Sequence, residues 1–344
     1  MHPGKITLVP ALLLIYTATL YSRDHPCPAD TSKTPCQLQA MRRLDEALEL
    51  MQKHYYKKNT VQWDSLIAGA RARLCLSGSC EEAYETINWC FSRLHENHSF
   101  IMQPPKAAVF NYDTTQMEEK PRLESLVGSI EGRLLDDHTA YITVPWVGTV
   151  DSAICSRVAD SLQGLIARLD EKGVTKWVVD LRRNRGGNCW PMLAGIGPLL
   201  GDGVCGYFVS NTEKVPISYK DGAAMHGKYV RCQSSKGYKI KEDNTRIAVL
   251  MDSRTSSAGE IVALAFKGKE QVAFYGSPTA GLTTANTTYM LSDKSMLVLT
   301  VCLEADRTGR ICEGKLVPDE IIDADDAAKR DKVMARAKMW LDLQ

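Results

Sequence analysis

Residues 247–260, which read IAVLMDSRTSSAGE, decide the fold class of this 344-residue chain. The five apolar residues 247–251 have the length and composition of a buried strand. A short polar turn follows, and apolar residues resume at Ala258 as a helix. A buried strand that enters a helix through a tight turn is typical of α/β proteins, so the segment predicts an α/β fold.

Ser257 lies at the junction of this strand and helix. A serine here projects its hydroxyl from the turn, and the N–H of Ala258 points toward developing negative charge at the helix N-terminus. The nucleophile elbow G-x-S-x-G has the same geometry, although Thr255 stands at the position of its first glycine. Because serines before helices are also common N-caps, the turn alone fits a nucleophile or a cap.

A second polar turn, residues 180–188 (DLRRNRGGN), follows the apolar run 177–181. Its consecutive glycines, Gly186 and Gly187, allow backbone N–H groups to approach a ligand closely. We expect one of these groups to form an oxyanion hole together with Ala258. The alternative is an ordinary strand-to-helix turn.

The third segment, residues 94–100 (LHENHSF), contains two histidines. His98 is a candidate general base, since histidine is the residue most often used for proton transfer near neutral pH. His95 and His98 could share a helix face as metal ligands, but no third ligand is apparent. The sequence therefore predicts no metal site and no cofactor.

Together these segments resemble the tail-specific, or C-terminal processing, serine peptidases. That family shares a D-L-R-x-N-x-G-G turn and a T-x-S-A-x-E nucleophile motif, which occur here at residues 180–187 and 255–260. The chain also has GSPTAG at 276–281, similar to the family's G-x-P-T-x-G, and VPD at 317–319. The resemblance implies a ClpP/crotonase-like spiral β-β-α core behind an N-terminal helical bundle. It also implies endopeptidase chemistry on extended polypeptide substrates.

Two departures point to one branch of the family. Leu282 occupies the place where processing peptidases commonly have a lysine base, and only about 40 residues separate Phe100 from the strand at Tyr141, too few for a PDZ domain. Both features resemble the branch that includes the nisin-resistance protein and the tricorn core. In that branch a histidine of the N-terminal helical region is the base, a role that falls on His98.

The resemblance completes the predicted site, with Ser257 as nucleophile and His98 as base. Glu313 is our candidate for a carboxylate that orients the imidazole, with Glu304 and Asp306 as alternatives. Cys189 follows the glycine turn but has no histidine in its own segment, which disfavours it as a nucleophile. The competing function is a non-catalytic module that binds a peptide or an apolar ligand on the same scaffold.

Apolar spacing divides the chain into a helical bundle at residues 37–105 and an α/β core at 122–344. In the bundle, apolar residues recur every three or four positions in three successive segments. The core alternates apolar runs with amphipathic segments, and residues 287–291 and 296–303 predict a hairpin. A polar helix is expected from about residue 327.

The N-terminal segment predicts export. Lys5 precedes an uncharged run, 6–21, so residues 1–22 read as a signal peptide or a membrane anchor, followed by a linker at 23–36. Eleven cysteines fit an oxidising compartment, and the first pairs expected to bridge are Cys27–Cys36, Cys75–Cys80 and Cys302–Cys312. The net charge of +1, without a basic patch, predicts no nucleic-acid partner. We make no prediction of oligomeric state.

Overall fold

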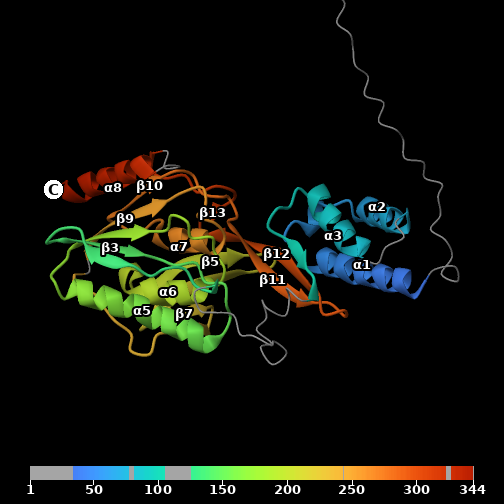
Figure 1. Ribbon diagram of the computed structural model, residues 1–344, viewed down its shortest axis with the longest axis horizontal. Coiled ribbons are helices and arrows are strands. Elements are labelled where there is room, and N and C mark those ends of the chain that lie inside the picture. The colour runs from blue at the N-terminus through green and yellow to red at the C-terminus, as the bar shows by residue number, and fades with distance from the viewer. Residues whose placement is uncertain (1–33, 77–80, 105–124, 243, 323–326, 344) are drawn as a thin grey trace, which may run out of the picture.

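The computed structural model describes residues 34–76, 81–104, 125–242, 244–322 and 327–343. Three helices lie at one end of the molecule and a larger α/β core lies at the other, with the long strands β11 and β12 running between them (Figure 1). The expected mixed α/β architecture with N-terminal helices is therefore confirmed.

The helical end consists of α1 (Pro35–His54), the short 3-10 helix η2 (Lys58–Thr60), α2 (Trp63–Leu76) and α3 (Glu82–Arg93). Thr34 caps α1 through its side chain, and a proline follows at the first helical position, where no N–H is needed. The helix thus begins inside the predicted linker 23–36. Residues 1–33 lie outside the described residues, so the expected signal or anchor stays a prediction.

A β-hairpin of the core completes the apolar interior of the bundle. Its strands are β11 (Thr284–Met290) and β12 (Met296–Ala305), which confirms the predicted hairpin and lengthens it. Leu291, Leu297 and Leu299 pack in the same buried cluster as the three helices. The segment after α3 also pairs with this hairpin, because β1 (Phe100–Met102) runs antiparallel to β12. The end of the bundle is therefore fixed to the core.

The centre of the core is a six-stranded sheet in the order β14-β10-β9-β4-β3-β2, parallel except at β2. Its strands are β2 (Gly132–Leu134), β3 (Thr139–Thr143), β4 (Lys176–Asp180), β9 (Arg246–Met251), β10 (Val272–Gly276) and β14 (Glu320–Ile321). Successive side chains point to opposite faces, as the strand period requires. Trp177 and Val179 join the main core, whereas Val178 packs beneath α8 (Ala327–Asp342).

The main core lies between this sheet and a second, antiparallel one. The helices of the main core are α5 (Ser152–Asp170), α6 (Cys189–Leu200) and α7 (Ala258–Phe266). The second sheet runs β1-β12-β5-β6-β7-β8, with β11 and β13 (Ile311–Cys312) also paired to β12. Its remaining strands are β5 (Gly203–Val209), β6 (Lys214–Lys220), β7 (Ala223–His226) and β8 (Tyr229–Gln233). These four strands were not predicted from the sequence.

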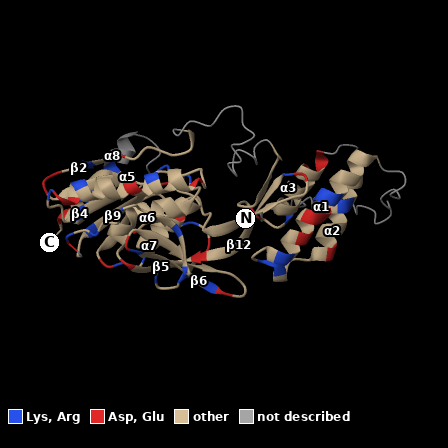
Figure 2. Ribbon diagram, turned by 90° about the horizontal axis from the view of Figure 1, so that it is seen from below, with Lys and Arg blue, Asp and Glu red and all other residues tan. Residues whose placement is uncertain are grey.

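Acidic and basic residues are interspersed on both the helical end and the core (Figure 2). Within the described part of the chain, no helix combines the length and apolar character needed to cross a membrane.

The cysteine prediction is wrong in one of its three pairs. Cys302 and Cys312 are both free thiols. The register of β12 and β13 places Cys312 opposite Glu304, so Cys302 is only a diagonal neighbour. Diagonal Cα atoms lie about 7–8 Å apart, beyond the usual span of a disulfide. Cys36 and Cys75 are disulfide-bonded, and because Cys27 and Cys80 lie outside the described residues, the pairs Cys27–Cys36 and Cys75–Cys80 stay predictions.

Candidate active site

Ser257 occupies a strained turn between β9 and α7. Its backbone has φ 51° and ψ −120°, a region that a residue with a side chain rarely adopts. Such strain costs about 1–3 kcal/mol and persists only where surrounding contacts hold it. The main-chain N–H of Ser257 donates to Glu260 Oε2 at 2.9 Å, and α7 begins at the next residue, Ala258. The turn therefore presents a hydroxyl beside a helix N-terminus.

Glu260 connects two of the sequence motifs. It is fully buried, and its carboxylate also accepts hydrogen bonds from the N–H groups of Gly281 at 2.9 Å and Leu282 at 2.8 Å, and from the Thr279 hydroxyl. Burial raises the pKa of Glu260, while these hydrogen bonds act in the opposite direction. The glutamate of the nucleophile motif thus fixes the 276–281 turn against Ser257.

Asn184 fixes the glycine turn against the same strained segment. Its main-chain carbonyl accepts the N–H of Ser256 at 3.0 Å, and its side-chain Oδ1 accepts the N–H of Gly186 at 2.9 Å. Gly186 has φ 89°, and a Cβ at this position would lie 2.6 Å from the carbonyl oxygen of Ser256 and 2.9 Å from Ser257 Cβ. Only glycine fits, because the two turns touch backbone to backbone.

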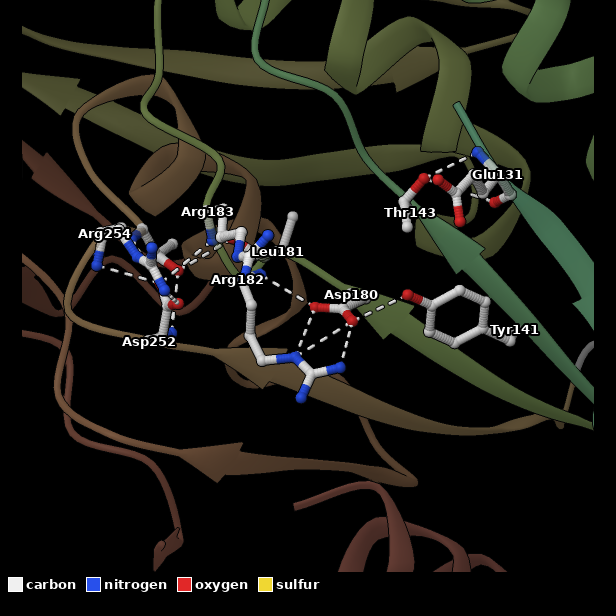
Figure 3. Close-up of polar contacts among 10 residues, drawn as sticks. Glu131, Tyr141, Thr143, Asp180, Leu181, Arg182, Arg183, Asp252 and Arg254 are labelled. Carbon is white, nitrogen blue, oxygen red and sulfur yellow. Dashed lines mark hydrogen bonds and ion pairs between the residues drawn. The ribbon is translucent and has the colours of Figure 1, made fainter. Parts of the chain in front are cut away.

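Two aspartates, Asp180 and Asp252, stabilise the strand ends next to these turns through hydrogen bonds (Figure 3). Asp180, at the end of β4, pairs with Arg182 and accepts the Tyr141 hydroxyl at 2.9 Å. Asp252, directly after β9, accepts the N–H groups of Arg183 at 3.0 Å and Arg254 at 2.9 Å. The aspartate of the D-L-R motif therefore has a structural role.

The segment after α3 places His98 over the Ser257 turn. Glu96 Oε1 accepts the main-chain N–H groups of His98 at 2.8 Å and Ser99 at 3.2 Å. The same oxygen accepts the Thr300 hydroxyl of β12 at 3.1 Å, and Asn286 of β11 donates its side-chain N–H to the His98 carbonyl at 2.9 Å. The backbone of His98 is thus held by both strands of the hairpin.

The His98 ring bridges two hydroxyl groups. Its Nε2 lies 3.0 Å from Ser257 Oγ, and its Nδ1 lies 2.7 Å from Thr284 Oγ1. The residue is 8% exposed, and burial lowers the pKa of the imidazole to about 4. The ring is therefore neutral at physiological pH, the protonation state required to accept a proton.

Two of the main-chain N–H groups expected to form the oxyanion hole have no hydrogen-bond acceptor among the described residues. Within the described residues, neither Ala258 N–H nor Gly187 N–H donates a hydrogen bond. Gly187 is held beside Val147, which accepts from Asn188 and donates to Gly186. The prediction that Gly186 could supply a donor needs correction, because its N–H is already bound by Asn184.

Glu313 does not occupy the predicted position beside the imidazole. It forms an ion pair with Lys57 at 2.5 Å, and its side chain is 57% exposed. Of the alternatives, Asp306 accepts hydrogen bonds within its own turn, from Thr308 N–H among others. Glu304 is buried, and within the described part of the chain neither of its oxygens has a hydrogen-bond partner; burial raises its pKa well above the usual value. The imidazole Nδ1 faces a threonine instead.

The sequence also raised Cys189 as a nucleophile and a metal site as alternatives. Cys189 is buried, and burial, with the nearby Glu304 carboxyl, raises the pKa of its thiol, so it is protonated rather than a thiolate. Among the residues that the structure describes, no group of three or more His, Cys, Asp and Glu side chains could hold a metal ion. The sequence prediction missed two residues that contact His98: Thr284, which lies outside the quoted motifs, and Glu96, which lies within the 94–100 segment but was given no role.

Comparison with known proteins identifies the family of the chain. Residues 138–322, more than half of the chain, match the profile of peptidase family S41. The chain belongs to peptidase family S41. This confirms the family inferred from the four motifs.

This S41 protein is 34% identical to the nisin-resistance protein of Lactococcus lactis subsp. lactis over 218 residues. The match covers 63% of this chain and 66% of the relative. A lipoprotein from Streptococcus agalactiae has a similar structure, with TM-score 0.66 and 23% identity, over 88% of this chain and 96% of that one. The photosystem II D1 C-terminal processing protease superposes with TM-score 0.55 and 15% identity, over 88% and 97% of the two chains. Both structures show a shared fold.

Proposed function

We propose that this S41 protein is a serine endopeptidase that cleaves extended polypeptide substrates with Ser257 and His98. The observation that carries the proposal is the 3.0 Å approach of His98 Nε2 to Ser257 Oγ. These residues lie 159 positions apart and come from the helical end and the core, so local sequence does not account for their contact. A hydroxyl in a strained turn beside a neutral, buried imidazole is the arrangement required of an activated nucleophile.

The proposed reaction begins when Ser257 Oγ attacks the substrate carbonyl carbon and its proton passes to His98 Nε2. The carbonyl oxygen becomes an oxyanion, which the N–H groups of Ala258 and Gly187 stabilise. His98 returns the proton to the leaving amine as the C–N bond breaks. Water then loses a proton to His98 and attacks the acyl-enzyme, and the proton returns to Ser257 Oγ as the acid leaves.

The same proposal includes the fold class of the core, the way substrate binds and the location of the protein in the cell. We assign the core to the ClpP/crotonase-like spiral β-β-α class, with the helical bundle as a lid on the site. Substrate enters as an extended strand that makes main-chain hydrogen bonds to an exposed sheet edge.

We further propose that the protein is exported, with residues 1–22 as a signal peptide or an anchor. Fractionation of cells that express the full chain, with sequencing of the mature N-terminus, tests the last point.

A fluorophosphonate probe tests the chemistry directly, because it reacts with activated serines. Mass spectrometry of the labelled protein should place the adduct on Ser257, and Ser257→Ala should abolish labelling. Ser256→Ala is the matched control, since it removes the neighbouring hydroxyl. Peptide-library cleavage by the purified protein then defines the sequence preference. A folded protein that binds peptides but is neither labelled nor proteolytic would favour the binding-module alternative over this proposal.

A further inference from the structure

The group that faces Nδ1 of His98, the ring nitrogen that does not contact Ser257, is a hydroxyl and not a carboxylate. Thr284 Oγ1 lies 2.7 Å from Nδ1, closer than Ser257 Oγ is to Nε2 on the other side of the ring. Thr284 is half-buried on β11 and belongs to none of the four motifs that identified the family. Its neighbour two residues along, Asn286, holds the His98 backbone. One strand therefore positions both the ring and the main chain of the base.

The proposed base step decides which nitrogen must carry the ring proton. To accept the Ser257 proton at Nε2, a neutral imidazole must have its hydrogen on Nδ1. That Nδ1–H is buried and needs an acceptor, because an unsatisfied buried donor is costly. Thr284 Oγ1 is within hydrogen-bond distance and supplies it.

Carboxylates that could have accepted the Nδ1–H of His98 bind other groups or are buried elsewhere. Glu96 accepts the main-chain N–H of His98 rather than the ring, and Glu260 binds the Ser257 turn from α7. Glu304 on β12 is buried with a raised pKa. After β13, Glu313 pairs with Lys57, the cation that follows α1. Burial is accordingly the cause of the lowered pKa of His98.

From this geometry we propose that Thr284 is the positioning residue of the base: it accepts the Nδ1–H of His98, directs Nε2 toward Ser257, and takes the place of a triad carboxylate. The inference rests on the proposed function. A hydroxyl can hold the ring in the productive orientation, but it brings no negative charge to the imidazolium that forms during the reaction. The site is thus a Ser–His pair with a neutral third member.

Substitutions at Thr284 separate orientation from charge. Thr284→Val keeps the shape and removes the acceptor, so kcat should fall about 10- to 100-fold with little change in KM, because one buried donor loses its partner. Thr284→Ser should restore most of the activity. Thr283→Val is the matched control: it deletes the adjacent hydroxyl, which bonds to the Gly314 carbonyl and does not touch the ring. Equal losses in the valine and serine variants would overturn the proposal.

Nitrogen-15 NMR of the imidazole tests the same inference without any substrate. In the neutral wild type, the His98 ring should be protonated at Nδ1, with His98→Gln used to assign the signals. Thr284→Asp should raise the pKa of His98 by about one unit or more, since a carboxylate stabilises the imidazolium. Protonation at Nε2, or an unchanged pKa in the aspartate variant, would contradict the role of Thr284. Absence of peptidase activity alongside the expected NMR result would instead count against the proposed function.

Discussion

The free energy of unfolding should depend on pH through His98, because the fold buries this imidazole in its neutral form. Burial lowers its pKa from 6.5 to about 4. Below pH 6.5 the unfolded chain binds a proton at this position that the folded protein does not bind until about pH 4. The contribution of His98 to stability is therefore complete above pH 6.5 and is lost as the pH falls toward 4.

The size of the effect follows from the difference between the two pKa values. One pKa unit corresponds to about 1.4 kcal/mol, so the full contribution is about 3 kcal/mol. Between about pH 7.5 and pH 4.5 most of the unfolded chain becomes protonated at His98, while most of the folded protein does not. The expected loss over that interval is about 2–3 kcal/mol.

Urea unfolding at the two pH values measures this loss. Other groups also titrate in the interval, so the informative quantity is the difference between wild type and His98→Gln, which has no titrating ring. Wild type should lose about 2–3 kcal/mol more than the variant. His138→Gln, which removes an exposed imidazole, should behave as wild type does. If wild type and His98→Gln lost the same stability on acidification, the account of a buried neutral base would be refuted.

Three further predictions concern the surroundings of the site. Gly186→Ala should reduce fluorophosphonate labelling at least about 100-fold, because the added Cβ would collide with the Ser256–Ser257 turn. Gly173→Ala is the control and should label normally, since Gly173 also has a left-handed backbone but open space around it. Glu313→Gln should leave kcat unchanged and alter stability by less than about 1 kcal/mol, since its ion pair with Lys57 is solvent-exposed. Glu260→Gln should lower the urea midpoint by an amount equivalent to about 1–3 kcal/mol, because the amide has one acceptor oxygen in place of two, and the donors that face its NH2 group lose their acceptor.

The four inner strands of the central sheet, β3, β4, β9 and β10, were predictable because they are largely buried. Residues 177–179 of β4 and 247–251 of β9 are apolar without interruption, so their composition marks them as strands. The second sheet offered a weaker signal. β6 and β8 carry exposed polar residues beside apolar ones over only 7 and 5 residues, and their pairing is set by neighbours rather than by local sequence. Residues 203–233 therefore stayed unassigned.

In the candidate site, too, residues with a distinctive local sequence could be predicted, and contacts between distant parts of the chain could not. Ser257, Ala258 and Gly187 could be named as candidates because each lies in a short turn directly after an apolar strand, where the local sequence is distinctive. The partner of the imidazole could not, because Thr284 reaches His98 only through strand pairing across 186 positions. Glu313 was chosen from its distance along the chain, which says nothing about which way a side chain points.

The central claim is that Ser257 and His98 act as one unit, and a double-mutant cycle on peptide hydrolysis tests it most directly. The assay compares kcat for wild type, Ser257→Ala, His98→Gln and the double variant on the best peptide from a library. We predict that each single change lowers kcat by several orders of magnitude and that combining them costs little more. Small losses that simply multiply in the double variant would contradict it.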